Sequence, residues 1–106
     1  MLKHDFRGKS GRKYQYTYFG PRSELPIQAG VFIFAKGSPQ IPSPVYIEAA
    51  NLMRKHVRNS ALWLRARDEH GATLIFVHTE FGSDPDSRMA EQDDLKEAYQ
   101  PPMNDG

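Results

Sequence analysis

Three side chains in this sequence could cooperate in cleaving a phosphodiester, although they lie far apart along the chain. Tyr46 stands in an apolar segment typical of a strand, Lys55 in a basic segment and Glu91 in an acidic one. Hydrolysis of a phosphodiester needs a positioned water, a base, and positive charge near the phosphoryl oxygens. A phenol beside a cation loses its proton more easily and can activate water, and an ammonium group can hold a phosphate. These residue types carry groups suited to this chemistry, and a site would require that the fold bring them together.

Glu91 is the carboxylate with the most informative position. It precedes Leu95 by four residues, so both side chains should lie on one side of a helix. Leu95 should face the core, which places Glu91 at the edge of the core and facing a sheet. A single carboxylate there needs a hydrogen-bonding partner or a metal ion. The alternative is an acidic surface helix, because further acids follow: Asp93, Asp94 and Glu97.

The strands that would position Tyr46 can be read from the apolar pattern. Alternating aromatic and polar residues over 13–20 predict a strand, and nearly continuous apolar runs over 31–35 and 73–79 predict strands buried on both faces. A further strand over 45–49 should pair antiparallel with 31–35. The connection over 37–44 is too rich in proline for a strand interior.

Helices are predicted over 51–57, 61–69 and 85–99. The last of these has the strongest start, with Asp84 as the capping residue and Pro85 in the first turn. The fold class is therefore α/β in the sense of α+β: a small antiparallel sheet of three to four strands flanked by about three helices.

Composition and charge narrow the function classes. Residues 1–67 carry twelve Lys or Arg and three acids, whereas residues 68–106 carry two and ten. The basic half offers an electrostatic footprint for nucleic acid, or else the two halves fold together and neutralise each other. The chain has no cysteine, so thiolate zinc sites and disulfides are excluded, and no apolar run approaches the roughly 20 residues of a membrane span. We expect a cytoplasmic protein that does not enter a membrane.

The N-terminal region holds further candidate contacts to nucleic acid. Residues 1–13 are polar and basic and predict a flexible arm, followed by one domain over 14–106 that opens with an extension strand. Arg12 and Lys13 precede alternating tyrosines, which would stack bases if exposed or fill the core if buried. Arg58 is a third basic candidate.

In chain order, several segments resemble the GIY-YIG nuclease family. These segments are GVFIF (30–34), VYIE (45–48), NLMRKH (51–56), Glu91 with Leu95 four residues later, and YQPPMN (99–104). In that family a tyrosine on each of two strands points into one pocket, a helical arginine neutralises phosphate charge, and a later glutamate holds a divalent metal. The resemblance implies that Tyr46 activates water, Lys55 or Arg54 steadies the phosphate, and Glu91 binds Mg²⁺ or Mn²⁺. Asn104 would tie the C-terminal tail to the sheet near the site.

This sequence departs from the family pattern at positions where the chemistry would occur. Phe32 replaces the first tyrosine and keeps the ring without the hydroxyl. Glu48 replaces a glycine and adds a negative charge that repels phosphate unless it binds a metal. The family arginine falls at His56 without a gap and at Lys55 with a one-residue deletion, and His56 could serve as a base.

The resemblance implies a nucleic-acid-directed domain, and a metal-dependent DNA endonuclease if it is active. The first alternative is a degenerate member that binds DNA or RNA without cutting it. The second is a structural or protein-interaction module, whose partner the sequence does not identify.

Overall fold

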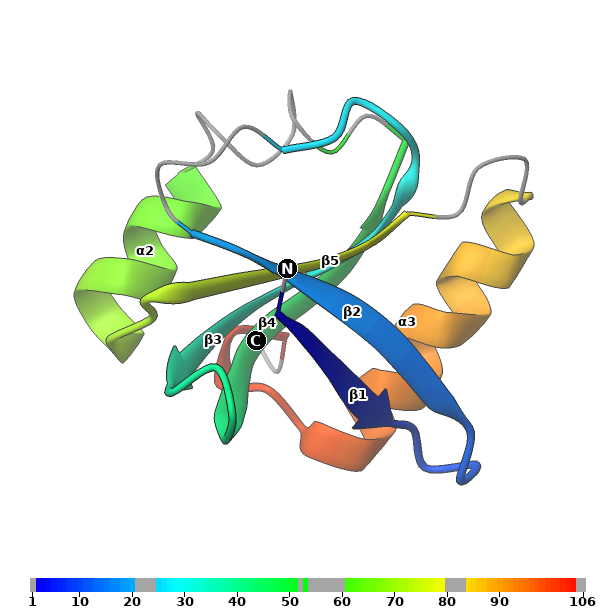
Figure 1. Ribbon diagram of the computed structural model, residues 1–106, viewed down its shortest axis with the longest axis horizontal. Coiled ribbons are helices and arrows are strands. Elements are labelled where there is room, and N and C mark those ends of the chain that lie inside the picture. The colour runs from blue at the N-terminus through cyan, green and yellow to red at the C-terminus, as the bar shows by residue number, and fades with distance from the viewer. Residues whose placement is uncertain (1, 21–24, 52, 54–60, 80–83, 105–106) are drawn as a thin grey trace.

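Five strands form one fully antiparallel sheet in the computed structural model, which describes residues 2–20, 25–51, 53, 61–79 and 84–104 (Figure 1). The order across the sheet is β1-β2-β5-β3-β4. The strands are β1 (Lys3–Arg7), β2 (Lys13–Phe19), β3 (Gly30–Gly37), β4 (Pro42–Ala50) and β5 (Leu74–Thr79). The predicted α+β class and antiparallel sheet are confirmed, with five strands in place of three to four.

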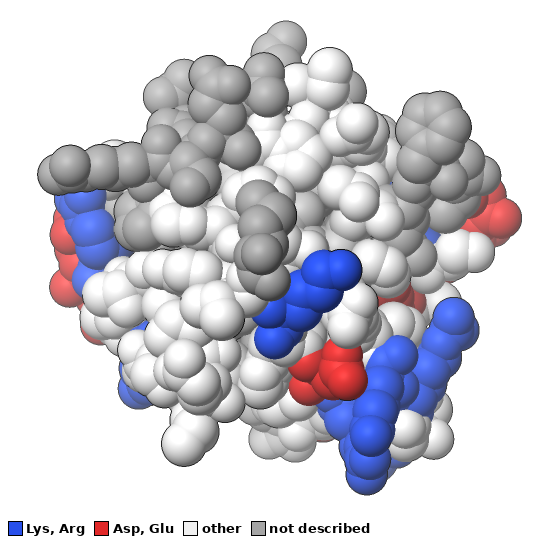
Figure 2. Space-filling view, in the orientation of Figure 1, with Lys and Arg blue, Asp and Glu red and all other residues white. Residues whose placement is uncertain are grey.

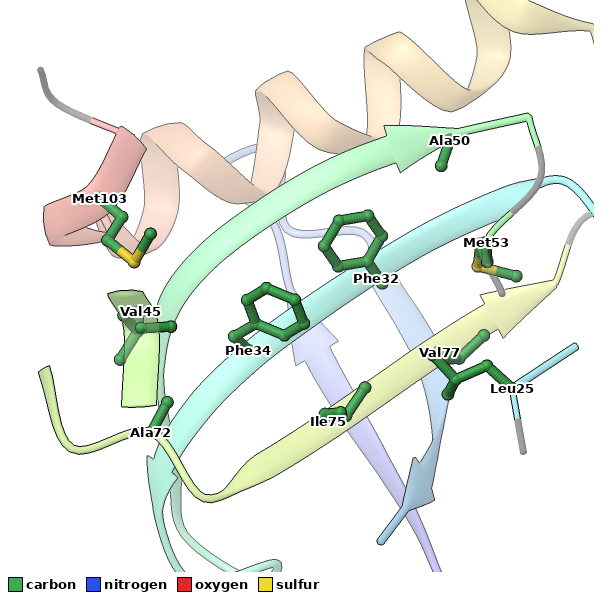
Figure 3. Packing of buried hydrophobic residues seen from close by; sticks show 11 residues of the cluster. Leu25, Phe32, Phe34, Val45, Ala50, Met53, Ala72, Ile75, Val77 and Met103 are labelled. Carbon is green, nitrogen blue, oxygen red and sulfur yellow. The ribbon is translucent and has the colours of Figure 1, made fainter. Parts of the chain in front are cut away.

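Two helices cover opposite faces of this sheet, α2 (Ala61–His70) and α3 (Pro85–Tyr99) (Figure 1). Alternation along β3 divides its buried side chains between the faces. Phe32 and Phe34 point to the face covered by α2, called the α2 face, together with Val45 and Val77 (Figure 3). The other face, called the α3 face, carries the remaining apolar core: Phe6, Tyr14, Tyr16, Val31, Ile33, Ala35, Ile47, Leu74, Phe76 and Leu95.

Helix α3 begins and ends as its sequence predicts. The Asp84 side chain accepts a 2.7 Å hydrogen bond from the backbone N–H of Ser87, and Pro85 is the first helical residue. At the other end Gln100 has a left-handed backbone (φ 46°), and its N–H donates to the carbonyl of Lys96. A short 3₁₀ turn, η1 (Pro102–Asn104), follows and carries the tail back to β4.

Two predictions about the sheet are wrong. Residues 1–13 are not simply a flexible arm, because Lys3–Arg7 forms β1 and pairs with β2 while Phe6 is fully buried. The proline-rich connection is shorter than expected, because β4 already begins at Pro42. Prolines are accommodated there because β4 is an edge strand with a register irregularity opposite Phe34 and Ala35.

The other predicted strands and the helix predicted over 61–69 match their predicted positions. The strands predicted over 13–20, 31–35 and 73–79 appear as β2, β3 and β5, and β3 pairs antiparallel with β4. The helix predicted over 61–69 is α2, whereas the one predicted over 51–57 falls largely outside the described residues. None of the helices in the described ranges is long and apolar enough to cross a bilayer.

The outer edge of β4 is covered by side chains. Asn104 accepts from the backbone N–H of Ile47 (2.9 Å) and donates to its carbonyl (3.0 Å), so the predicted tie between the tail and the sheet is confirmed. Gln92 on α3 accepts from the backbone N–H of Ala49 at 2.8 Å. Three backbone groups that an edge strand normally leaves to water are satisfied in this way.

We predict that Asn104→Ala destabilises the fold by about 1–3 kcal/mol, because it removes two hydrogen bonds to partly buried backbone. Urea unfolding at neutral pH measures the change. Asn104→Asp keeps the acceptor but sets a carboxylate oxygen against the Ile47 carbonyl oxygen, so it should be no more stable than the alanine variant. Equal stability of all three proteins would show that the tie contributes nothing.

Candidate functional site

Glu91 lies in a buried polar cluster between α3 and the sheet. Its side chain is 3% exposed. The Tyr16 hydroxyl, from β2, donates to Glu91 Oε2 at 2.5 Å, and Nδ1 of His78, from β5, lies 3.1 Å from Oε1 and 3.0 Å from Oε2. The prediction that Glu91 faces the sheet is therefore confirmed, and its partners are a phenol and an imidazole.

The carboxylate determines which nitrogen of His78 carries a proton. A carboxylate can only accept hydrogen bonds, so Nδ1 must donate in this geometry. In the neutral ring the lone pair is then on Nε2, and in the protonated ring His78 and Glu91 form an ion pair. The His78 side chain is 31% exposed, so the cluster reaches from the core to the surface. The arrangement can hold an imidazole in a fixed orientation at the surface.

The surroundings of Glu91 do not fit the predicted magnesium or manganese site. These cations prefer several oxygen ligands, usually carboxylates and waters. Both Glu91 oxygens already accept hydrogen bonds from Tyr16 or His78. Among the described residues, no group of three His, Asp or Glu side chains is placed to hold a metal ion.

Tyr46 lies on the α2 face. Its ring packs beside Phe32 and Phe34, with centroids 6.1 and 6.0 Å away, and its hydroxyl donates to Glu48 Oε2 at 2.8 Å. Burial first, and then the hydrogen bond and negative charge of Glu48, raise the pKa of Tyr46 well above its usual value. The phenol therefore loses its proton less readily than a free tyrosine, which opposes the predicted role in activating water.

The structure does not bring Tyr46 and Glu91 into one pocket. Tyr46 packs with the α2-face core, whereas Glu91 contacts Tyr16 and His78 on the α3 face. Tyr46 and Glu91 therefore do not form the expected shared hollow, because they lie on opposite faces of the sheet. The four basic candidates on the intervening segment, Arg54, Lys55, His56 and Arg58, lie outside the described residues.

The sequence did not point to the polar character of the sheet-facing side of α3. Arg88 and Gln92 are buried there beside Glu91, and Arg88 donates from Nη2 to Asn51 Oδ1 at 2.9 Å. The spacing of three and four residues between them was readable as one helix face. Polar residues such as Arg88 and Gln92 usually indicate an exposed helix face, so the sequence did not predict that this face is buried. Nothing in the sequence distinguished His78 and Tyr16 from other strand residues.

A basic surface covers the outside of the β1–β2 hairpin. Its outer face, called the ribbon face, consists of Lys3, Asp5, Arg7, Lys13, Gln15 and Thr17, all exposed except the half-buried Thr17. The residues that alternate with these, such as Phe6 and Tyr14, point to the other side of the hairpin and are buried. Of the two interpretations of the alternating tyrosines, the structure therefore confirms the one in which they fill the core. Figure 2 shows lysine and arginine side chains gathered over this hairpin.

Two cations stand directly opposite each other on the ribbon face. Arg7 pairs with Lys13 in the register, and the flanking bond from Gly8 N–H to the Arg12 carbonyl makes this a non-hydrogen-bonded pair. Side chains in such pairs are closest, and like charges there destabilise a sheet. Arg12 itself is exposed, with its guanidinium 5.2 Å from the Tyr14 ring centre. The surface therefore keeps a repulsion that a bound anion would relieve.

Asp94 attaches the tip of this hairpin to α3. Its carboxylate accepts from the backbone N–H of Ser10 (2.9 Å), the Ser10 hydroxyl (2.7 Å) and the Tyr14 hydroxyl (2.9 Å). Chiefly the Ser10 hydroxyl hydrogen bond lowers the pKa of Asp94, while burial and Asp94 raise the pKa of Tyr14 to about 12. A Cβ at position 8 would collide with the Asp94 carboxylate, so a larger residue there would displace this side chain from its hydrogen bonds.

Comparisons with protein-family models, with curated proteins and with solved structures found no match to this chain.

We predict that Tyr16→Phe destabilises the protein by about 1.5–3 kcal/mol, because the buried Glu91 carboxylate loses a donor. Tyr18→Phe, a half-buried tyrosine on the same strand, is the matched control and should change stability little. Urea unfolding of both variants measures the difference. Equal losses would mean that the Tyr16 hydroxyl does not support Glu91.

The lowered pKa of Asp94 predicts a pH-dependent contribution to stability. A carboxyl with a lower pKa in the folded chain stabilises it above the unfolded value, and this contribution is lost as pH falls through the folded value. The gap in unfolding free energy between wild type and Asp94→Asn should be full above the ordinary pKa of 3.8 and shrink below it. Asp93→Asn removes the same charge from the exposed neighbouring residue and is the control, and a gap for Asp94→Asn that is independent of pH would contradict the assignment.

Proposed function

We propose that this chain is a nucleic-acid-binding domain that holds its ligand through the ribbon face and does not cleave it through Glu91. The observation that carries the proposal is the pair of exposed cations, Arg7 and Lys13, held side by side on a rigid two-stranded surface. Phosphates along a nucleic-acid backbone supply the closely spaced negative charges that such a surface favours.

The charge distribution supports the same proposal. Three acids on α3, Asp86, Asp93 and Glu97, are exposed, and this helix packs on the face opposite the ribbon face. Cations elsewhere are partly neutralised, because Arg65 and Arg67 on α2 pair with Glu69 and Asp68. The hairpin therefore concentrates positive charge on one side of a nearly neutral molecule, which steers a polyanion to that side.

The resemblance to GIY-YIG nucleases remains part of this proposal. The antiparallel β3–β4 pair and the tie from Asn104 to β4 support a related fold. The separation of Tyr46 from Glu91, together with Phe32 and Glu48, favours the degenerate binding domain over the metal-dependent DNA endonuclease. A protein-interaction module is the other alternative that the binding experiment distinguishes. The absence of cysteine suits a reducing compartment, and we propose the cytoplasm.

We predict that the protein retains a DNA duplex at low salt and that its affinity falls steeply as salt rises. Lys13→Gln should reduce the slope of log affinity against log salt by about one. Arg65→Gln removes the same charge from α2 and should leave the slope unchanged. Fluorescence anisotropy with a labelled duplex measures both, and no retention at low salt would exclude the proposal and favour a protein-interaction module.

The nuclease alternative has its own assay. Supercoiled plasmid is incubated with the protein and Mg²⁺ or Mn²⁺, beside a Glu91→Gln variant whose folding is checked by circular dichroism. We expect binding without nicking by either protein. Nicking by the wild type that disappears in the folded variant would restore the endonuclease interpretation.

A further inference from the structure

The far half of the β1–β2 hairpin is a two-stranded ribbon. Strand β2 pairs with β5 only over Thr17–Phe19, whereas its pairing with β1 extends to Lys13 opposite Arg7. Within the described residues, the part of β2 over 13–16 therefore has β1 as its one strand neighbour. Figure 1 shows this ribbon extending beyond β5 alongside α3.

The ribbon is held rigid from one side. Phe6 and Tyr16 are fully buried on the α3 face, with ring centroids 5.3 Å apart. The Tyr99 hydroxyl accepts from the backbone N–H of Arg7 at 3.1 Å, and Asp94 holds the tip through Ser10. The opposite, solvent-facing side is therefore presented by a fixed backbone, which favours defined contacts over loose electrostatic binding.

The centre of the ribbon face is not cationic. Asp5 and Gln15 are directly opposite each other, and both are exposed. Lys3 lies on one side of this pair, and Arg7 with Lys13 lies on the other. A surface that only held phosphates would be weakened by Asp5, because a carboxylate repels them. Asp and Gln side chains instead suit base edges, where Gln pairs with adenine and Asp accepts from the cytosine amino group.

The shape and the residue types favour one kind of nucleic acid. The six residues of the ribbon face include no aromatic side chain on which unpaired bases could stack. A two-stranded ribbon fits the major groove of B-form DNA, which is about 12 Å wide, whereas the major groove of an RNA duplex is too narrow for side chains to read.

We propose that the ribbon face enters the major groove of B-form DNA, with Asp5 and Gln15 against base edges and the flanking Lys3, Arg7 and Lys13 on the phosphates. This inference rests on the proposed nucleic-acid binding and adds the ligand class and the reading residues. It also explains why an acidic residue, Asp5, lies at the centre of a basic surface, because its carboxylate would accept a hydrogen bond from a base.

Selection from a random-sequence duplex pool with the purified chain tests the proposal. A preferred sequence should emerge, and it should bind more tightly than an RNA duplex or a single DNA strand of the same sequence. Gln15→Ala should weaken binding to the preferred sequence by about fivefold to a hundredfold and leave binding to random duplex unchanged. Gln40→Ala, an exposed glutamine on the β3–β4 turn, is the matched control and should change neither.

Groove-specific competitors give an independent measurement. Methyl green, which occupies the major groove, should displace the protein, whereas netropsin in the minor groove should not. Binding that is equal for the duplexes and the single strand, or insensitive to Gln15→Ala, overturns the major-groove inference and leaves phosphate binding intact. Failure to bind any nucleic acid at low salt overturns the proposed function itself.

Discussion

The buried Glu91 carboxylate is the constraint on which the arrangement of this fold depends. A carboxylate that is 3% exposed is strongly destabilising unless its oxygens are hydrogen-bonded. Tyr16 and His78 meet that need from two different strands, so a single side chain joins α3 to both β2 and β5. Because Tyr16 also packs against Phe6, the same contact secures the added hairpin. The N-terminal strands are thereby integrated into the core rather than attached to its edge.

Glu91 thus has a structural role in this fold, and its contacts do not favour a metal-binding role. A carboxylate that holds a phenol and an imidazole in place has little capacity left for a hydrated cation, and Tyr46 is held by Glu48 on the other face of the sheet. The feature that could contact a ligand is instead the charge exposed on the surface. Within the described residues, α2 packs over β3 and β4, whereas Lys3, Arg7 and Lys13 lie exposed on the outer side of β1 and β2. Burial and charge thus divide the hairpin between a packed side and an exposed, charged side.

Local sequence signals were sufficient for most of the secondary structure. Asp84 and Pro85 fixed the start of α3, and the apolar runs located β3 and β5, because capping and hydrophobic periodicity act over a few residues. Strand β1 was missed because Phe6 is the one residue of its short segment that is fully buried. The candidate site was less accessible. The order of the strands decides which residues meet Glu91. It brings Tyr16, 75 positions away in the sequence, and His78, 13 positions away, to this carboxylate, and it leaves Tyr46 on the opposite face.

The covered edge of β4 affects how separate molecules of this protein interact in solution. Asn104 and Gln92 occupy hydrogen-bonding positions that an incoming strand would otherwise use. Without the Asn104 side chain the backbone groups of Ile47 would become a template for intermolecular pairing, whereas Gln92 would still cover the N–H of Ala49. The 3₁₀ turn that carries Asn104 thus guards the outer edge of β4 against strand addition by a second molecule, a role separate from its contribution to the stability of one molecule.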